Sequence, residues 1–191
     1  MRLVTFDIET KNTFADVGGR EPSMLDLSLV SIHDTETEEF SSYFEEDLSK
    51  LWPVLEKSDA LIGFNSNHFD IPILNKYYPG DLTEFKSIDL LESIKNSLGR
   101  RIGLDAIAEA TLGHRKSGHG LEAIEWWNNG ELEKLREYCE QDVRVTKAVY
   151  DFIKENGYVK FRSNDGLRNI PIDVSDWDKP LDSTVTHTLP F

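Results

Sequence analysis

Two acids lie on one face of a segment that is otherwise typical of a buried strand. Residues 3–10 read LVTFDIET, and β-branched and aromatic residues of this kind favour a strand. Because successive side chains of a strand point to opposite faces, Asp7 and Glu9 share one face, and Phe6 and Ile8 share the other. Neighbouring carboxylates repel each other when they lose water, and a divalent cation is the usual compensation. Their hard oxygen ligands favour Mg²⁺ or Mn²⁺, whereas the alternative is an exposed edge strand with two solvated acids.

The composition fits one domain with its own core. The chain has 191 residues, of which 39% are hydrophobic and 29% charged, as in ordinary soluble proteins. It contains no apolar run long enough to span a bilayer, and its first residues do not read as a secretory signal. The single cysteine, Cys139, excludes an intrachain disulfide and suits a reducing compartment. We therefore expect a cytoplasmic protein without membrane contact.

The net charge restricts how such a chain meets nucleic acid. With 35 acidic and 21 basic residues the formal net charge is −14, which repels polynucleotides over most of the surface. Attraction must then be local, from bound cations, a few Lys and Arg side chains and backbone N–H groups. This charge argues against tight non-specific binding, but it is compatible with catalysis at a nucleic-acid end.

The order of the expected elements indicates an α/β domain. Strands come first, then a β-α-β unit whose second strand is parallel to the first, then a mainly helical half. We expect residues 1–156 to form this domain, and residues 157–191 to form a hairpin and a tail that pack on it or trail from it. The expected loops are 11–26 and 113–120; the expected strands are 29–33, 39–44, 60–64, 158–163 and 170–174; the expected helices are 47–57, 69–78, 87–98, 104–112, 121–128 and 131–155.

The longest expected helix carries an acid in an apolar stripe. Spacings of three and four residues gather one set of side chains on a single face of residues 131–155. Asp142 occupies a core-facing position in that stripe, and Tyr138 lies one turn before it. Asp142 is either a buried functional group or an acid at the stripe's edge that accepts a hydrogen bond from a neighbouring N–H. The stripe consists of Leu135, Tyr138, Asp142, Val145, Val149 and Phe152.

A further acid, Asp70, lies where an apolar strand runs into a helix. Residues 63–70 read GFNSNHFD, and the opening of a helix carries a positive partial charge that favours an acid. Functional sites of α/β proteins gather where parallel strands end. The simpler alternative is that Asn67 or Asp70 caps the helix.

A strand, a strand–helix junction and a helix thus supply four acids. Two divalent ions about 3.5–4 Å apart would neutralise Asp7, Glu9, Asp70 and Asp142 and clamp both oxygens of an in-line phosphoryl displacement. Tyr138 lies one helical turn from the last acid and is a candidate to orient the attacking water. The ordinary pKa of a tyrosine, near 10, suits this orienting role better than that of a base.

These residues resemble, in order and spacing, the three motifs of the DEDD 3′–5′ exonuclease superfamily. The motifs here are Asp7-Ile8-Glu9, Asn65-x-x-x-Phe69-Asp70 and Tyr138-x-x-x-Asp142. A tyrosine four residues before the last acid is similar to the tyrosine branch, and Glu137 stands where the histidine branch has its histidine. Intervening residues such as Ile88-Asp89-Leu90 and Leu112-Gly113 are similar to the exonuclease domains of family-B DNA polymerases and their stand-alone relatives.

The resemblance implies a ribonuclease H-like α/β fold. Such a fold has a mixed central sheet, with a three-stranded antiparallel meander and then parallel strands, and helices on both faces. The resemblance also implies two Mg²⁺ or Mn²⁺ ions and hydrolysis of a 3′-terminal nucleotide to a nucleoside monophosphate. It assigns metal ligation to Asp7, Glu9, Asp70 and Asp142, and positioning of the water to Tyr138.

Candidate substrate contacts follow from the same resemblance and from the loops. Thr10 follows the first motif and Asn65 is the asparagine of the second, so both are candidates to hold the terminal nucleotide. Lys116, in a polar loop, is a candidate phosphate contact, or it is a solvated charge. Trp126 and Trp127 offer a stacking surface for bases, or at least one of them belongs to the core.

The expected function is a divalent-metal-dependent 3′–5′ exonuclease that releases nucleoside monophosphates from single-stranded DNA ends, with proofreading or repair trimming as hypothetical uses. The preference for DNA rests on the closer similarity to polymerase-associated relatives, and a 3′–5′ exoribonuclease on the same fold is an alternative. A catalytically idle scaffold that binds nucleic acid or protein and a metal-dependent endonuclease are two further competing functions. With a net charge of −14, we expect weak substrate affinity unless a polymerase, helicase or other replication or repair partner delivers the strand.

Overall fold

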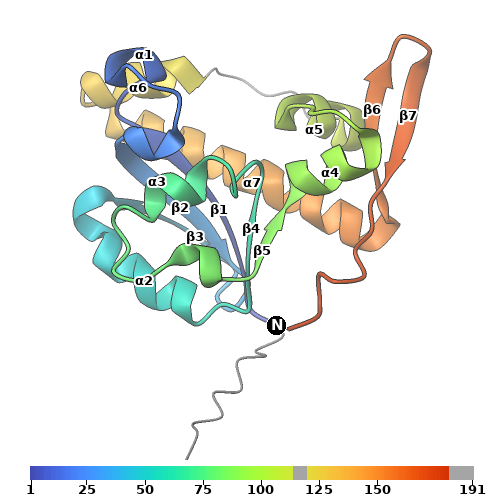
Figure 1. Ribbon diagram of the computed structural model, residues 1–191, viewed down its shortest axis with the longest axis horizontal. Coiled ribbons are helices and arrows are strands. Elements are labelled where there is room, and N and C mark those ends of the chain that lie inside the picture. The colour runs from blue at the N-terminus through green and yellow to red at the C-terminus, as the bar shows by residue number, and fades with distance from the viewer. Residues whose placement is uncertain (114–119, 181–191) are drawn as a thin grey trace, which may run out of the picture.

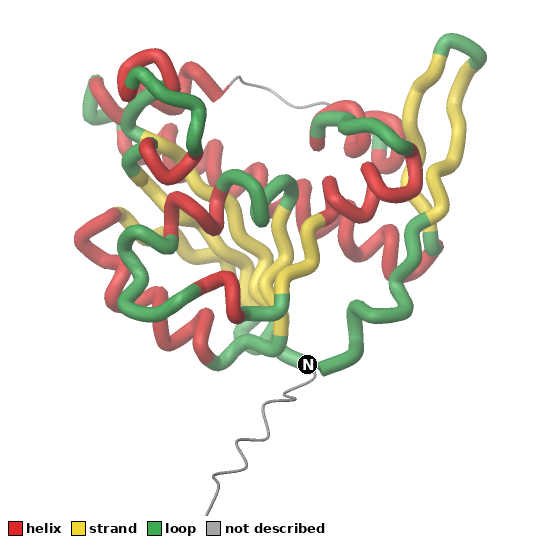
Figure 2. The backbone as a smooth tube through the Cα atoms, in the orientation of Figure 1, coloured by secondary structure: helices red, strands yellow, loops and turns green. Residues whose placement is uncertain are grey.

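The computed structural model describes residues 1–113 and 120–180 of the chain. Within them, helices cover both faces of a five-stranded mixed sheet in the order β3-β2-β1-β4-β5, and two further strands form a hairpin (Figure 1, Figure 2). The strands are β1 (Leu3–Thr10), β2 (Leu27–Asp34), β3 (Glu39–Phe44), β4 (Ala60–Gly63), β5 (Ser87–Asp89), β6 (Tyr158–Ser163) and β7 (Gly166–Pro171). The helices are α1 (Phe14–Val17), α2 (Leu48–Glu56), α3 (Asp70–Leu74), α4 (Leu90–Leu98), α5 (Leu104–Leu112), α6 (Gly120–Asn128) and α7 (Leu132–Asn156).

β1 lies at the centre of the sheet. It is antiparallel to β2, which is antiparallel to β3, whereas β4 is parallel to β1 and β5 is parallel to β4. The predicted architecture, a meander followed by parallel strands with helices on both faces, is therefore confirmed. The ladder between β1 and β4 joins Leu3–Thr5 to Ala60–Ile62. Among the described residues, the second half of β1 has no ladder partner on its β4 side.

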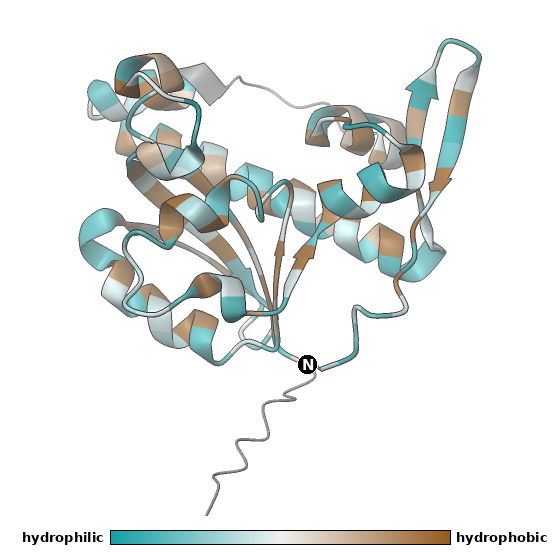
Figure 3. Cartoon of the chain, viewed as in Figure 1, coloured by the Kyte–Doolittle hydropathy of each residue, from teal (hydrophilic) through white to brown (hydrophobic). Residues whose placement is uncertain are grey.

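The two faces of β1 meet different surroundings. Phe6 and Ile8 are buried in one cluster with Leu51 of α2 and Leu74 of α3. Figure 1 shows α2 and α3 on one side of the sheet and α7 on the other, and Figure 3 shows hydrophobic residues along the strands between them. Burial of a side chain as large as Phe6 stabilises a fold by about 1.5–3 kcal/mol. The predicted alternation of β1 therefore decides which helices pack on which face.

The buried face of α7 includes residues next to the predicted stripe and leaves two members of the stripe half-buried. Val145 and Phe152 are half-buried, whereas Cys139, Thr146 and Ile153 are fully buried. Small side chains such as Cys and Thr let the helix approach the sheet closely, although they do not stand out as part of a hydrophobic stripe in the sequence.

None of the described helices, α7 included, is long and apolar enough to cross a membrane.

The helix predicted over residues 87–98 begins as a strand instead. Residues 87–89 form β5, in which Ile88 pairs with Ile62 of β4, and α4 starts at Leu90. A three-residue strand is too short to show alternation, and it forms because a distant strand supplies its hydrogen bonds.

The segments that follow β1 and β4 also differ from the prediction. The loop predicted over residues 11–26 contains α1, for which Thr13 and Asp16 form a capping box. The helix predicted over residues 69–78 is shorter and ends at Leu74, after which the backbone continues in turns.

The hairpin has a tighter turn than the sequence indicates. β7 begins at Gly166 rather than at the predicted Ile170. Asn164 and Asp165 alone form the turn, and Gly166 follows with a φ of 114° that favours glycine. The end of the predicted tail, residues 181–191, lies outside the described residues.

Lys86, just before β5, holds the segment that follows the hairpin. Its Nζ donates to three backbone carbonyls: those of Asp176 (2.9 Å), Trp177 (2.6 Å) and Lys179. The Trp177 ring stacks on Tyr150 of α7, with centroids 5.2 Å apart and planes at 13°. The segment is therefore docked on the same domain.

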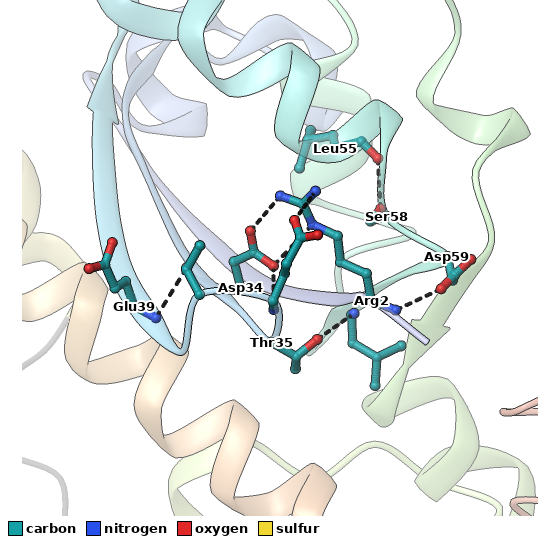
Figure 4. Close-up of polar contacts among 10 residues, drawn as sticks. Arg2, Asp34, Thr35, Glu39, Leu55, Ser58 and Asp59 are labelled. Carbon is teal, nitrogen blue, oxygen red and sulfur yellow. Dashed lines mark hydrogen bonds and ion pairs between the residues drawn. The ribbon is translucent and has the colours of Figure 1, made fainter.

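The start of β1 is tied to its two neighbours (Figure 4). The Arg2 guanidinium donates to both carboxylate oxygens of Asp34 at 3.1 and 2.6 Å, and its backbone N–H donates to Asp59 at 2.6 Å. The N–H of Leu3 donates to the Thr35 hydroxyl at 2.8 Å. These bonds join the start of β1 to the end of β2 and to the residue before β4.

Candidate active site

β1 and α7 bring two acids and a thiol together. Asp7 and Glu9 are half-buried on β1, and Cys139 is buried on α7. One ligand atom from each of these three residues lies within 4.8 Å of the other two. The sulfur of Cys139 is 3.7 Å from Oδ2 of Asp7. The face that carries the two strand acids is therefore the face on which α7 packs.

Asp142 reaches the same region from α7. It lies one turn beyond Cys139 and is 8% exposed. Burial is the main cause that raises the pKa of Cys139 and of Asp70, and the charge of Asp142 raises both further. Asp142 is thus in electrostatic contact with both groups. Tyr138, one turn before it, is also buried, and its ring meets Trp126 edge-on at 5.5 Å.

Asp70 is a buried acid at the first residue of α3. Burial raises its pKa to about 7, and the charges of Asp89 and Asp142 add to this effect. The backbone N–H groups of Asp70 itself and of Ile8 hydrogen-bond to the carboxylate and lower its pKa. A nearby divalent cation would favour the charged carboxylate, because opposite charge offsets the cost of burial.

The donor set suits a hard divalent cation. Asp7, Glu9, Asp70 and Asp142 offer carboxylate oxygens, which are the ligands that Mg²⁺ and Mn²⁺ accept. Cys139 is different, because burial raises its pKa well above the ordinary value and keeps it a thiol. A thiol is a poor metal ligand compared with a thiolate. The acidic cluster therefore fits a metal site in which Cys139 is a neighbour rather than a ligand.

Asp89 has two structural roles near these acids, one of which the sequence does not reveal. It caps α4, accepting from the N–H groups of Leu91 at 2.9 Å and Glu92 at 3.3 Å. It also accepts from the N–H groups of Asn65 at 2.9 Å and Asn67 at 3.0 Å. Asp89 therefore joins α4 to the junction that leads into α3. The cap signal is local and readable, whereas the second pair of bonds depends on the parallel pairing of β4 with β5.

The predicted substrate contacts have different surroundings. Asn65 is half-buried just after β4 with a left-handed φ of 67°, and its Oδ1 accepts from Arg101. Thr10 is buried at the end of β1, and its hydroxyl donates to the carbonyl of Asn12 at 3.0 Å. Lys116 lies outside the described residues. Asn65 therefore stands at the acid-bearing junction, while the Thr10 hydroxyl has a local partner.

A cavity of about 370 Å³ adjoins Tyr138. Trp126 lines this cavity and also packs, with Trp127, against the buried cluster around Leu29. Both tryptophans are half-buried, so each belongs partly to the core. The remaining lining residues are Lys134, Glu137 and Gln141.

Comparisons with known proteins agree with this architecture. The family model described as RNase_H superfamily matches residues 4–154. A comparison with curated proteins gave no match. Among solved structures, the chain is similar to the family B DNA polymerase from the hyperthermophilic archaeon Pyrobaculum calidifontis, with a TM-score of 0.63 and 18% sequence identity. That match covers 81% of this chain and 24% of the polymerase chain, so this chain spans about a quarter of its length. The predicted ribonuclease H-like fold is confirmed, and the chain belongs to the RNase H superfamily.

Proposed function

We propose that the protein is a divalent-metal-dependent 3′–5′ exonuclease that releases nucleoside monophosphates from single-stranded DNA ends. The observation that carries this proposal is the convergence of acids from β1, α3 and α7. Ligand atoms of Asp7 and Glu9 lie within 4.8 Å of the Cys139 sulfur. The charge of Asp142 acts on both Cys139 and Asp70. Membership of the RNase H superfamily and the likeness to a DNA polymerase support the assignment to the nucleases.

In this proposal Asp7, Glu9, Asp70 and Asp142 hold two Mg²⁺ or Mn²⁺ ions. The raised pKa of Asp70 supports a cation, because the buried carboxylate is unfavourable without a positive charge nearby. Two ions would polarise the phosphodiester and supply a nucleophile at neutral pH. Asp89 would act as a positioning residue, since its bonds to Asn65 and Asn67 fix the junction from which Asp70 projects.

Tyr138 is proposed to orient the attacking water through its hydroxyl. Its ring is buried and meets Trp126 edge-on, so packing restricts the ring to few orientations. A fixed hydroxyl one helical turn from Asp142 can hold a water in line with the scissile bond. The cavity beside Tyr138 provides room for part of the terminal nucleotide.

The proposed direction of hydrolysis and the proposed substrate rest on the order of the motifs, not on a contact with nucleic acid. The 3′–5′ direction follows from the resemblance of the three motifs to the DEDD superfamily, and the preference for DNA from the resemblance to polymerase-associated members. An exoribonuclease and a catalytically idle scaffold are the competing functions. The complete set of acids argues against the scaffold. A polymerase, helicase or other replication or repair protein is the proposed partner.

Product analysis on an end-labelled single strand tests the proposal. A 5′-labelled oligodeoxynucleotide should shorten stepwise from its 3′ end with Mg²⁺ or Mn²⁺, release nucleoside monophosphates, and remain intact with EDTA. A circular single strand should survive, because it has no end. Cleavage of the circle would identify an endonuclease, and faster loss of a matched RNA strand would overturn the preference for DNA. Persistence of every strand with both metals would favour the scaffold.

A further inference from the structure

Three arginines lie on the side of the molecule formed by α4, α5 and the β6–β7 hairpin. Arg100 and Arg101 occupy the connection between α4 and α5, and Arg162 lies on β6. Arg100 and Arg162 line one cavity of about 350 Å³, and the Arg100 guanidinium lies over the Phe161 ring at 5.7 Å. Figure 1 shows α4, α5 and the β6–β7 hairpin grouped on this side of the molecule, and α5 contacts β6. We call these three residues the arginine cluster.

The arginine cluster is unusual in a chain of net charge −14. Four other arginines of the described chain, Arg2, Arg136, Arg144 and Arg168, pair with carboxylates within 4 Å. Arg100, Arg101 and Arg162 are all exposed, and none of them pairs with a carboxylate of residues 1–113 or 120–180. Exposed positive charge that is not held in an ion pair is where an acidic protein attracts an anion.

One hydrogen bond connects the arginine cluster to the acidic site. Arg101 donates to Oδ1 of Asn65, which follows β4 and whose backbone N–H is held by Asp89. The same junction leads into α3 and Asp70. The cluster therefore begins at the rim of the acidic site and continues outward to the cavity between α5 and β6.

We propose that the arginine cluster binds phosphates of the substrate strand on the 5′ side of its terminal nucleotide. This inference rests on the proposed function. Guanidinium groups match phosphate oxygens with paired N–H donors, so three of them suit successive phosphates of one strand. Glu109 also lines the cavity, which favours contact with the backbone at the arginines rather than deep entry of an anion. The cluster would attract the strand locally, although the overall charge of the protein repels it.

Kinetics of a double variant, Arg100→Ala with Arg162→Ala, test the proposal. The matched control is Lys50→Ala with Lys57→Ala, which removes the same charge at α2, on the far side of the sheet's core. On a long single strand, the arginine variant should raise KM about tenfold and leave kcat unchanged. On the p-nitrophenyl ester of thymidine 5′-monophosphate, which has no upstream phosphate, both variants should behave as the wild type. A wild-type KM on the long strand, or an equal defect on the ester, overturns the proposal.

Binding without turnover separates this inference from the proposed function. Fluorescence anisotropy of a labelled single strand in EDTA should show weaker binding by the arginine variant. Its slope of log Kd against log salt should fall by about 1.4, or about 0.7 for each lost phosphate contact. Inorganic phosphate at constant ionic strength should not displace the strand, and displacement would reduce the cluster to a simple anion site. If the wild type binds but degrades no strand, the proposed function fails; if it degrades strands and the variant keeps the wild-type slope, this inference alone fails.

Discussion

The sulfur of Cys139 lies 3.4 Å from the backbone oxygen of Asp7 and 3.7 Å from its Oδ2. Cys139 stands between Tyr138 and Asp142 on α7. This contact lies where α7 crosses the acid-bearing strand. A larger side chain at position 139 would separate the strand acids from the helix acid.

The buried thiol should be chemically silent in the folded protein. Burial raises the pKa of Cys139 well above its ordinary value, and the charges of Asp7 and Glu9 raise it further. Since the thiolate is the reactive form, a disulfide reagent such as DTNB should label no thiol in native protein near pH 8. The single cysteine should react fully in urea. Rapid labelling of the native protein would contradict the packing of α7 on β1.

Removing one acid should stabilise the metal-free protein. Asp142→Asn takes away a buried charge that acts on Asp70 and Cys139, so the melting temperature in EDTA should rise by about 2–4 °C, as expected for about 1 kcal/mol. The same variant should lose the stabilisation that Mn²⁺ gives to the wild type, and lose nuclease activity. Asp151→Asn, on the exposed face of α7, is the control. Equal Mn²⁺ stabilisation of Asp142→Asn and wild type would exclude Asp142 as a ligand.

Tyr138→Phe should separate turnover from metal binding. The variant keeps the buried ring and its contact with Trp126 but loses the hydroxyl, so kcat should fall about 10- to 100-fold. The rise in melting temperature with Mn²⁺ should stay at the wild-type value. Tyr150→Phe is the matched control, because Tyr150 is buried on the same helix and stacks on Trp177. Unchanged kcat in Tyr138→Phe would remove the proposed orienting role.

His33 should make the protein less stable in mild acid. The side chain is 2% exposed, and burial lowers its pKa, with the charge of Lys147 acting in the same direction. The unfolded chain, with a histidine pKa near 6.5, therefore takes up the proton first as the pH falls. Stability is lost from about pH 7 downward. His33→Gln should lessen the fall in melting temperature between about pH 7.5 and pH 5.5, whereas His68→Gln, at an exposed position, should not.

Lys86→Met should loosen the segment after the hairpin. The variant loses one charged donor to three carbonyls, which costs about 1–2 kcal/mol of unfolding free energy at a half-buried position. Urea denaturation measures this loss, and limited proteolysis should cut after residue 171 sooner than in the wild type. Lys179→Met removes an exposed ion pair with Asp176 and should cost less than about 0.5 kcal/mol. Equal effects of the two variants would deny Lys86 this docking role.

The local patterns of the sequence predict the helices and strands better than they predict which elements contact one another. The alternation in β1 and the helix over residues 104–112 agree with the structure, because each pattern repeats within its own segment. The pattern of residues 87–89 does not indicate β5, because the stability of that strand comes from its pairing with Ile62 in another strand. The proximity of the acids depends on where α7 crosses β1, and Cys139, a small residue that carries no helical signal, lies at that crossing. The motif order indicates four acids, whereas their proximity comes from the tertiary fold.

The early end of the β1–β4 ladder has a consequence for the whole molecule. At Gly63 the chain turns away from β1, and an added Cβ there would lie 2.3 Å from the Ser66 hydroxyl oxygen, so the turn requires glycine. The N–H of Ile8, left without a strand beside it, bonds to Asp70 instead. A longer β4 would complete the sheet and close the notch that admits an acid from another element. The short pairing of β4 with β1, rather than any added element, leaves the space in which Asp70 approaches the strand.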